Sequence, residues 1–145
     1  MPSRPRQRPQ RPGDPLTLAK LCLAAAARKK AEDPLLLDVA ALSGYADYFL
    51  ILSGRSTRQA AAIAESIQSV LKKSGVKLIG ADGVREGRWA VLDFGDVVVH
   101  VFHQPVREFY DLESLWTDAP RVEADPEELA DWLPPEAGRA ALLER

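Results

Sequence analysis

The two histidines of the chain, His100 and His103, are the side chains best suited to metal or proton chemistry, and both lie in an extended apolar segment. Residues three apart in a strand point to opposite faces, so this pair cannot hold one metal ion while both stay in the strand. A single histidine among apolar residues is more typical of a hydrogen-bonded core or interface position. The sequence therefore predicts no metal site here.

Carboxylates give no clearer catalytic pattern. Asp38 and Asp47 flank two apolar runs and could act as metal ligands or as an acid/base pair, but aspartate is equally a turn and capping residue, and we favour that role. Asp93-Phe94-Gly95 matches the kinase metal-binding tripeptide, yet the glycine-rich loop and catalytic loop of a kinase are missing. Neither a phosphate loop nor a dinucleotide fingerprint occurs. The sequence thus predicts a non-enzyme with no catalytic residues, no cofactor and no small-molecule substrate.

The single cysteine, Cys22, excludes an internal disulfide and a zinc site built from cysteines, and its position on an apolar helical stripe is typical of a small core residue. No apolar run approaches the roughly 18 residues of a membrane span, and no secretory signal is present. We therefore expect a cytoplasmic protein that does not enter a membrane. Hydrophobic content of 46% and charged content of 28% indicate a folded globular domain.

Charge is distributed unevenly along the 145 residues. Residues 1–13 carry four arginines and no acid, whereas residues 121–145 carry three arginines and seven acids. We interpret residues 1–13 as a disordered basic Arg/Pro tail, residues 14–118 as the domain, and residues 119–145 as an acidic C-terminal extension. The tail is either an arm that touches phosphate or a solubilising terminus. The domain itself is nearly neutral and is not expected to bind nucleic acid by electrostatics alone.

The stretch from Trp89 to Phe102 predicts a β-hairpin with Gly95-Asp96 as its two-residue turn, which places Phe94 opposite Val97. One face is then entirely apolar and should be buried: Ala90, Leu92, Phe94, Val97, Val99 and Val101. The other face mixes aromatic, acidic and imidazole groups that a core does not require: Trp89, Val91, Asp93, Val98, His100 and Phe102. This mixed face is the first candidate for a functional surface.

The remaining pattern predicts alternating helices and strands. We expect a helix from Asp14-Pro15 to Asp33-Pro34, strands at 35–39, 48–53 and 76–79, and a helix that begins with a capping box at Ser56–Gln59 and ends near Gly75. The N-terminus of that helix could bind an anion, although capping alone explains Ser56. A further short helix is expected through Trp132-Leu133.

The segment after Pro105 carries more large apolar side chains than one helix stripe can bury. These are Val106, Phe109, Tyr110, Leu112, Leu115 and Trp116. Two interpretations follow: either the segment is buried on two sides, or some of its aromatic residues are exposed for a partner.

Several of these motifs occur together in one order. They are Leu42-Ser43 with Tyr45–Phe49, Ser53-Gly54 with Ser56 and Arg58-Gln59, Trp89 with Asp93–Phe102, and Arg107 with Tyr110, Leu112-Glu113 and Leu115-Trp116. In this combination the chain resembles the ribosomal silencing factor family, also called Iojap-like, over roughly residues 16–118. The basic tail and the acidic extension lie outside the resemblance.

The resemblance implies a single compact α/β domain with a mixed β-sheet of about five strands flanked by helices, in a nucleotidyltransferase-like topology without known catalysis. It implies binding to the large ribosomal subunit through its fourteenth protein, which sterically blocks joining of the small subunit and represses translation under nutrient limitation. On matching positions it implies partner contacts at Trp89, Asp93, His100, Arg107, Tyr110, Glu113 and Trp116. Leu92 also matches, but the hairpin register directs it into the core.

Two other functions stay open at the level of sequence. A nucleotidyltransferase-like enzyme would need a Gly-Ser pair and two acids one residue apart on the next strand, but Gly54-Arg55-Ser56 interrupts the pair and the acids are missing. An RNA-binding module using the arginine tail would show steep salt dependence. An aromatic face left free away from the ribosome could also form a homodimer.

Overall fold

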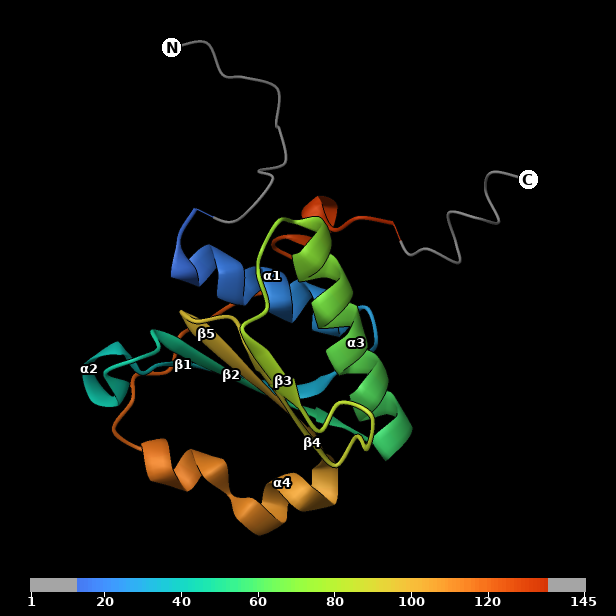
Figure 1. The fold of residues 1–145 in the computed structure, drawn as a ribbon. Helices are drawn as coiled ribbons and strands as arrows, with labels where there is room; N and C mark the ends of the chain where they lie inside the picture. The colour runs from blue at the N-terminus through green and yellow to red at the C-terminus, as the bar shows by residue number, and fades with distance from the viewer. Residues whose placement is uncertain (1–12, 136–145) are drawn as a thin grey trace.

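A mixed sheet of five strands in the order β1-β2-β5-β4-β3 forms the centre of the computed structural model, which describes residues 13–135 (Figure 1). Strand β5 runs parallel to β2, and every other neighbouring pair is antiparallel. The strands are β1 (Glu32–Asp38), β2 (Tyr48–Gly54), β3 (Gly80–Asp82), β4 (Trp89–Asp93) and β5 (Val97–His103). The expected mixed α/β sheet is confirmed.

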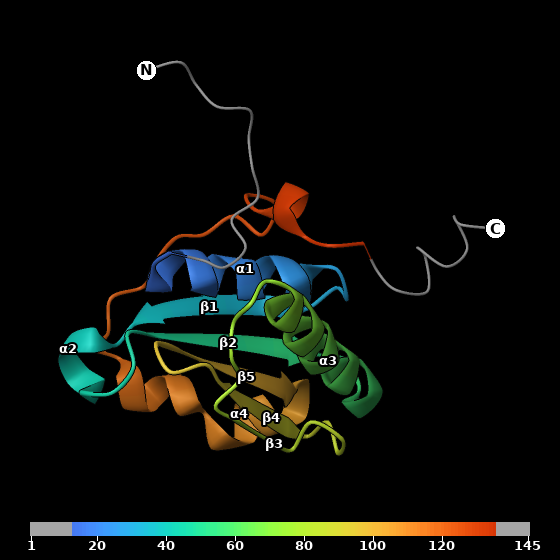
Figure 2. The same cartoon turned by 45° about the horizontal axis from the view of Figure 1, so that its top comes forward.

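Two helices, α1 (Pro15–Ala27) and α3 (Thr57–Lys73), cover one face of this sheet (Figure 2). The capping box at the start of α3 is present, because the Gln59 amide N–H donates to Ser56 Oγ at 3.0 Å. The Gln59 side chain accepts from the Arg55 amide at 2.6 Å and donates to the carbonyls of Lys29 and Lys30, each at 3.1 Å. The cap therefore also fastens the start of α3 to the end of α1.

The larger core lies between these helices and the sheet. It contains the apolar stripe of α3, the predicted apolar face of the hairpin and the fully buried Cys22 and Leu92. Burial raises the pKa of the Cys22 thiol, so this cysteine stays protonated and unreactive. The predictions that Cys22 and Leu92 are core residues are confirmed.

The hairpin has the predicted register, with Trp89 paired to Phe102 and Asp93 to Val98. Gly95 has φ +90°, a conformation that glycine adopts without strain at a two-residue turn. The expectation that the mixed face is free is wrong for β5, because α4 (Gln104–Tyr110) and the 3₁₀ helix η1 (Leu112–Trp116) cover it. Below them lies a second, smaller core in which Phe102 is fully buried.

The strand expected at 76–79 is wrong in position. Hydrogen bonding to β4 begins only where the Ile79 amide donates to the Asp93 carbonyl at 2.8 Å, and the strand itself is Gly80–Asp82, three exposed residues of low strand propensity. Val76 and Leu78 are apolar because they pack against the larger core from outside the sheet. Their burial, rather than strand pairing, explains the apolar pattern that suggested a strand.

Residues after 118 pack on the sheet and on α1. The Asp38 amide donates to the Pro120 carbonyl at 2.9 Å, and the Val122 amide donates to the Leu36 carbonyl at 2.8 Å, so this segment lines the outer edge of β1. Leu129 and Leu133 reach the larger core, and a short 3₁₀ helix, η2 (Ala130–Trp132), lies between them where the helix through 132–133 was expected. The basic tail up to residue 12 and the end of the acidic extension from residue 136 lie outside the described residues.

Candidate docking surface

The outer side of α4 and η1 exposes large apolar side chains that no core requires. Phe109 is 81% exposed, Leu115 77% and Tyr110 52%, and we call these three residues the outer apolar surface. Asp111, with φ +47°, ends α4 and turns the chain into η1. Inward-facing Val106, Leu112 and Trp116 pack on the smaller core instead. Of the two interpretations of this segment, exposure of some aromatic residues is therefore confirmed.

Trp89 forms the link between this surface and the sheet. Its ring stacks on Phe102 with centroids 4.8 Å apart and contacts the ring of Tyr110 with centroids 5.0 Å apart. The indole is half-buried, and its Nε1–H donates to Nδ1 of His100 at 3.2 Å. Tyr110 is consequently joined through Trp89 to the buried ring of Phe102 in the sheet.

His100 is only 8% exposed, and burial lowers its pKa to about 4. It is therefore neutral near pH 7. Because Nδ1 accepts the Trp89 hydrogen bond, the proton of the neutral ring is on Nε2, which has no hydrogen-bond partner within residues 13–135. The interpretation of His100 as a hydrogen-bonding core histidine is confirmed.

Arg107 is buried although it carries a permanent charge. Its Nη1 donates to the Asp33 carbonyl at 2.7 Å and to Ser53 Oγ at 2.8 Å, and its Nε donates to Glu113 Oε2 at 3.4 Å. One guanidinium thus connects α4 to the ends of β1 and β2 and to η1. The second Glu113 oxygen is buried without a hydrogen-bond partner in the described part of the chain. We call Arg107 with its three partners the arginine clasp.

Asp93 and Trp116 complete the set of residues implied by the resemblance. The Asp93 carboxylate accepts from the Gly95 amide at 2.8 Å and so holds the hairpin turn, while Trp116 packs its ring edge against Phe49 with centroids 4.8 Å apart. All seven implied residues thus belong to the mixed face or the layer that covers it. Only Tyr110 among them is more than half exposed.

Sequence reasoning assigned no role to several exposed apolar residues. Phe109 and Leu115 were signalled by the excess of apolar groups after Pro105, but nothing indicated which of that set would face outward. Leu42 and Tyr45 are also exposed, in and just after the one-turn helix α2 (Ala40–Ser43). Both views place α2 at the same end of the sheet as η1 (Figures 1 and 2).

The described residues offer little for other chemistry. Within residues 13–135, no group of three or more His, Cys, Asp or Glu side chains is arranged to hold a metal ion. Asp38 caps the following turn through the Ala40 amide at 3.1 Å, as favoured from the sequence. At the start of α3, Arg55 pairs with Glu32 at 2.7 Å and Ser56 is occupied by capping, which accounts for these residues without an anion.

A family model described as "Ribosomal silencing factor during starvation" matches residues 12–141. The chain belongs to the ribosomal silencing factor family. A relative of that name from Bacillus subtilis (strain 168) is 45% identical over 109 residues, which cover 75% of this chain and 92% of the relative. Membership of this family assigns the chain a role in ribosome silencing, which is regulatory.

Solved and more distant relatives agree with this assignment. The crystal structure of a protein from Chromobacterium violaceum superposes with a TM-score of 0.70 at 38% identity, covering 72% of this chain and 87% of that one. A mouse protein named "Mitochondrial assembly of ribosomal large subunit protein 1" is 33% identical, covering 62% of this chain and 41% of the mouse protein. The ribosomal silencing factor fold is therefore shown by sequence and by shape. None of the described helices is both long and apolar enough to cross a membrane.

Proposed function

We propose that this chain silences ribosomes in the cytoplasm by binding the large subunit through its fourteenth protein and sterically blocking the small subunit. The observation that carries the proposal is the outer apolar surface, since large aromatic and aliphatic groups exposed together mark protein contacts. The name of the mouse relative supports the large subunit as the partner. No catalytic step is part of this mechanism.

The seven residues implied by the resemblance divide into two roles in this proposal. Tyr110 touches the partner directly, and the partly exposed rings of Trp89, which contacts Tyr110, and of Trp116 add to the contact. The other four residues support the contact without touching the partner. Asp93 holds the hairpin turn and His100 holds the indole of Trp89. Arg107 and Glu113 hold the α4–η1 layer on the sheet. Phe109 and Leu115 join the contact as new members.

Replacing Phe109 and Leu115 by alanine together tests the proposal. Both side chains are mainly exposed, so folding should be little affected, whereas two apolar anchors are lost from the interface. We expect binding to weaken by about 2 kcal/mol or more, which is roughly 30-fold in Kd. Co-sedimentation with purified large subunits measures the binding, and light scattering measures how well the chain inhibits joining of the two subunits.

Ile79→Ala is the matched control, because Ile79 is 64% exposed but lies before β3, outside the α4–η1 layer. It should retain full binding and full inhibition of joining. If Ile79→Ala weakened binding as much as the double variant does, binding would depend on exposed apolar residues in general and not on a docking site at α4 and η1. Sedimentation of the wild-type chain with small subunits alone would contradict the proposed partner.

A further inference from the structure

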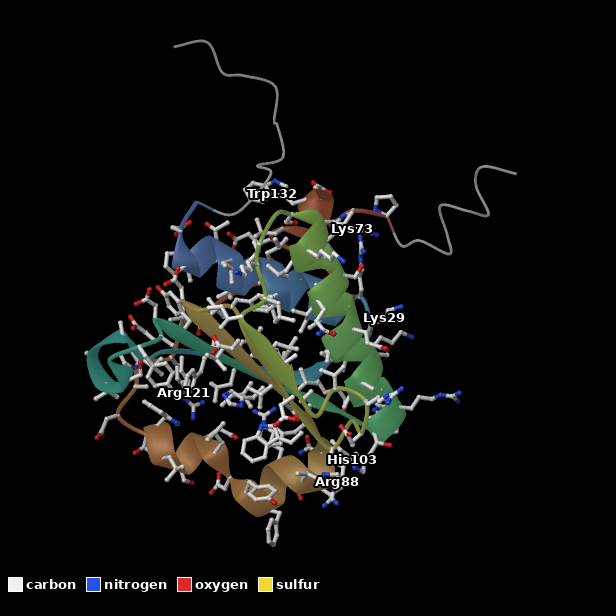
Figure 3. The ribbon with its side chains drawn as sticks, in the orientation of Figure 1. Lys29, Lys73, Arg88, His103, Arg121 and Trp132 are labelled. Atoms are coloured by element: carbon white, nitrogen blue, oxygen red, sulfur yellow. The ribbon has the colours of Figure 1, made fainter. Side chains whose placement is uncertain are left out.

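Three exposed arginines, Arg58, Arg85 and Arg88, lie at the end of the sheet where the parallel strands β2 and β5 finish, and we call them the arginine patch. At this end Gly54 of β2 pairs with His103 of β5, and the His103 amide donates to the Arg88 carbonyl at 2.9 Å. Figure 3 shows Arg88 and His103 beside one another near the start of α4. The patch thus lies at the corner of the molecule where α3 and α4 both begin.

The loop between β3 and β4, which carries Arg85 and Arg88, packs closely against the start of α3. A Cβ at Gly87 would lie 2.0 Å from the Thr57 carbonyl oxygen, so only glycine lets the loop come this near to the helix. Thr57 and Arg58 are the first two residues of α3. The contact between loop and helix therefore brings the three arginines to one corner.

The three guanidinium groups have no structural partner in the described part of the chain. Over residues 13–135, no ion pair or hydrogen bond involves their side chains, and the acids nearest in sequence to Arg85, Asp82 and Glu86, form no ion pair with them. The neighbouring Arg55 differs, because Glu32 neutralises it at 2.7 Å. The charges of the patch are consequently available to a ligand.

The position of Arg58 is, in addition, unfavourable for the helix that carries it. The amino end of a helix is the positive end of its dipole and favours acids, yet the first turn of α3 contains no acid and has Arg58 as its second residue. A phosphate group at this corner would interact favourably with the arginine and with the dipole together. An anionic partner therefore explains this arginine better than folding does.

The arginine patch lies next to the candidate docking surface. Arg88 directly precedes Trp89, and the ring of Trp89 contacts that of Tyr110 with centroids 5.0 Å apart. A particle that binds the outer apolar surface therefore also comes near the arginines, at the edge of the contact.

We propose that the arginine patch binds the phosphate backbone of ribosomal RNA, beside the protein contact made by the outer apolar surface. A planar guanidinium group donates two parallel hydrogen bonds to a phosphate, and three such groups at one corner suit a polyanion. The proposal rests on the proposed function, which brings the chain to an RNA-containing particle. It agrees with the nearly neutral net charge of −2, since the protein contact supplies the main affinity.

The test compares the salt dependence of large-subunit binding for two triple variants. The patch variant combines Arg58→Gln, Arg85→Gln and Arg88→Gln. The control variant removes three exposed charges at the far end of α3 and just beyond it, through Lys72→Gln, Lys73→Gln and Lys77→Gln. The wild-type chain should lose about 16-fold more affinity than the patch variant between 50 and 200 mM KCl, because three phosphate contacts contribute about 2 to the log–log slope. The control variant should keep the wild-type slope.

An unchanged slope in the patch variant, or an equal change in both variants, overturns the proposal while leaving the docking surface intact. Absence of wild-type binding to large subunits overturns both. A photo-crosslinker on Glu86→Cys keeps all three arginines and identifies the contacted molecule, because the native Cys22 is fully buried and does not compete for the label. Cross-links that ribonuclease removes support the patch as an RNA site, and cross-links only to ribosomal protein overturn it.

Discussion

His100 and Trp89 form a hydrogen-bonded pair inside an otherwise apolar layer. The indole N–H satisfies one imidazole nitrogen, and burial keeps the ring uncharged. Because the pKa of His100 falls from 6.5 in the unfolded chain to about 4 in the fold, the unfolded state binds more protons between these values. The contribution of this histidine to stability is therefore fully present above pH 6.5 and is lost as the pH falls toward 4.

Acidification from pH 7 to pH 4 should lower the free energy of unfolding by about 3 kcal/mol through His100 alone. Urea unfolding at several pH values measures the total, and His100→Gln isolates the histidine, since glutamine does not titrate and can still accept from Trp89. The variant should lose less stability between pH 7 and pH 4 than the wild type.

His103→Gln is the control for this prediction. His103 lies at the end of β5, is half-buried, and takes no part in the hydrogen bond between Trp89 and His100. If the free energy of unfolding of His100→Gln depends on pH in the same way as that of the wild type, protonation of His100 is not the cause of the loss of stability in acid.

At the residue scale, the sequence was sufficient for side chains whose roles depend on near neighbours. The strand pattern alone placed Leu92 in the core, and helical spacing did the same for Cys22. Arg107 could not be placed this way, because two of its partners, the Asp33 carbonyl and Ser53 Oγ, are 74 and 54 positions away. Only the folded sheet brings these acceptors together.

At the scale of elements, the α4–η1 layer is fastened differently from α1 and α3. Those two helices rest on an extensive apolar core, whereas α4 depends on the arginine clasp and a few apolar contacts. Within residues 13–135, three buried side-chain atoms have no hydrogen-bond partner, in His100, Gln104 and Glu113, and they also belong to this layer or to the strand below it. Each such atom costs free energy, so this layer is held less firmly than the opposite one.

Arg107→Lys should loosen this layer selectively. An ammonium group cannot reproduce the planar fork that reaches Asp33, Ser53 and Glu113, so we expect a loss of about 2 kcal/mol in the free energy of unfolding. Amide hydrogen exchange should accelerate in α4 and η1 more than in α3. Arg88→Lys, at an exposed arginine, should change neither quantity.

Elements with local signals were predictable, and those defined by distant pairing were not. The hairpin with its two-residue turn and the capped helix α3 each have boundaries that a few adjacent residues determine. Strand β3 has no such signal, since Gly80–Asp82 is extended only because β4 lies beside it. The burial of the mixed face was likewise not predictable from sequence, because it depends on where α4 and η1 pack on the sheet.

At the scale of the whole molecule, the described residues begin at Gly13, and the arginine-rich segment before them lies outside the described part of the chain. The family match begins at residue 12, and the first helix begins at Pro15. Deletion of residues 1–11 should therefore leave the free energy of unfolding and large-subunit binding unchanged, as measured by urea unfolding and co-sedimentation. A large loss of binding on deletion would instead favour an RNA-binding arm in the arginine-rich tail.

The backbone pairing of residues 120–122 along β1 has a consequence for the chain when no ribosome is available. An uncovered edge strand offers free amide and carbonyl groups to a second chain and so seeds fibrils. Here one edge is occupied by the Pro120 and Val122 hydrogen bonds, and the opposite edge is only three residues long. The two edges of the sheet therefore offer little free backbone for pairing with a second chain.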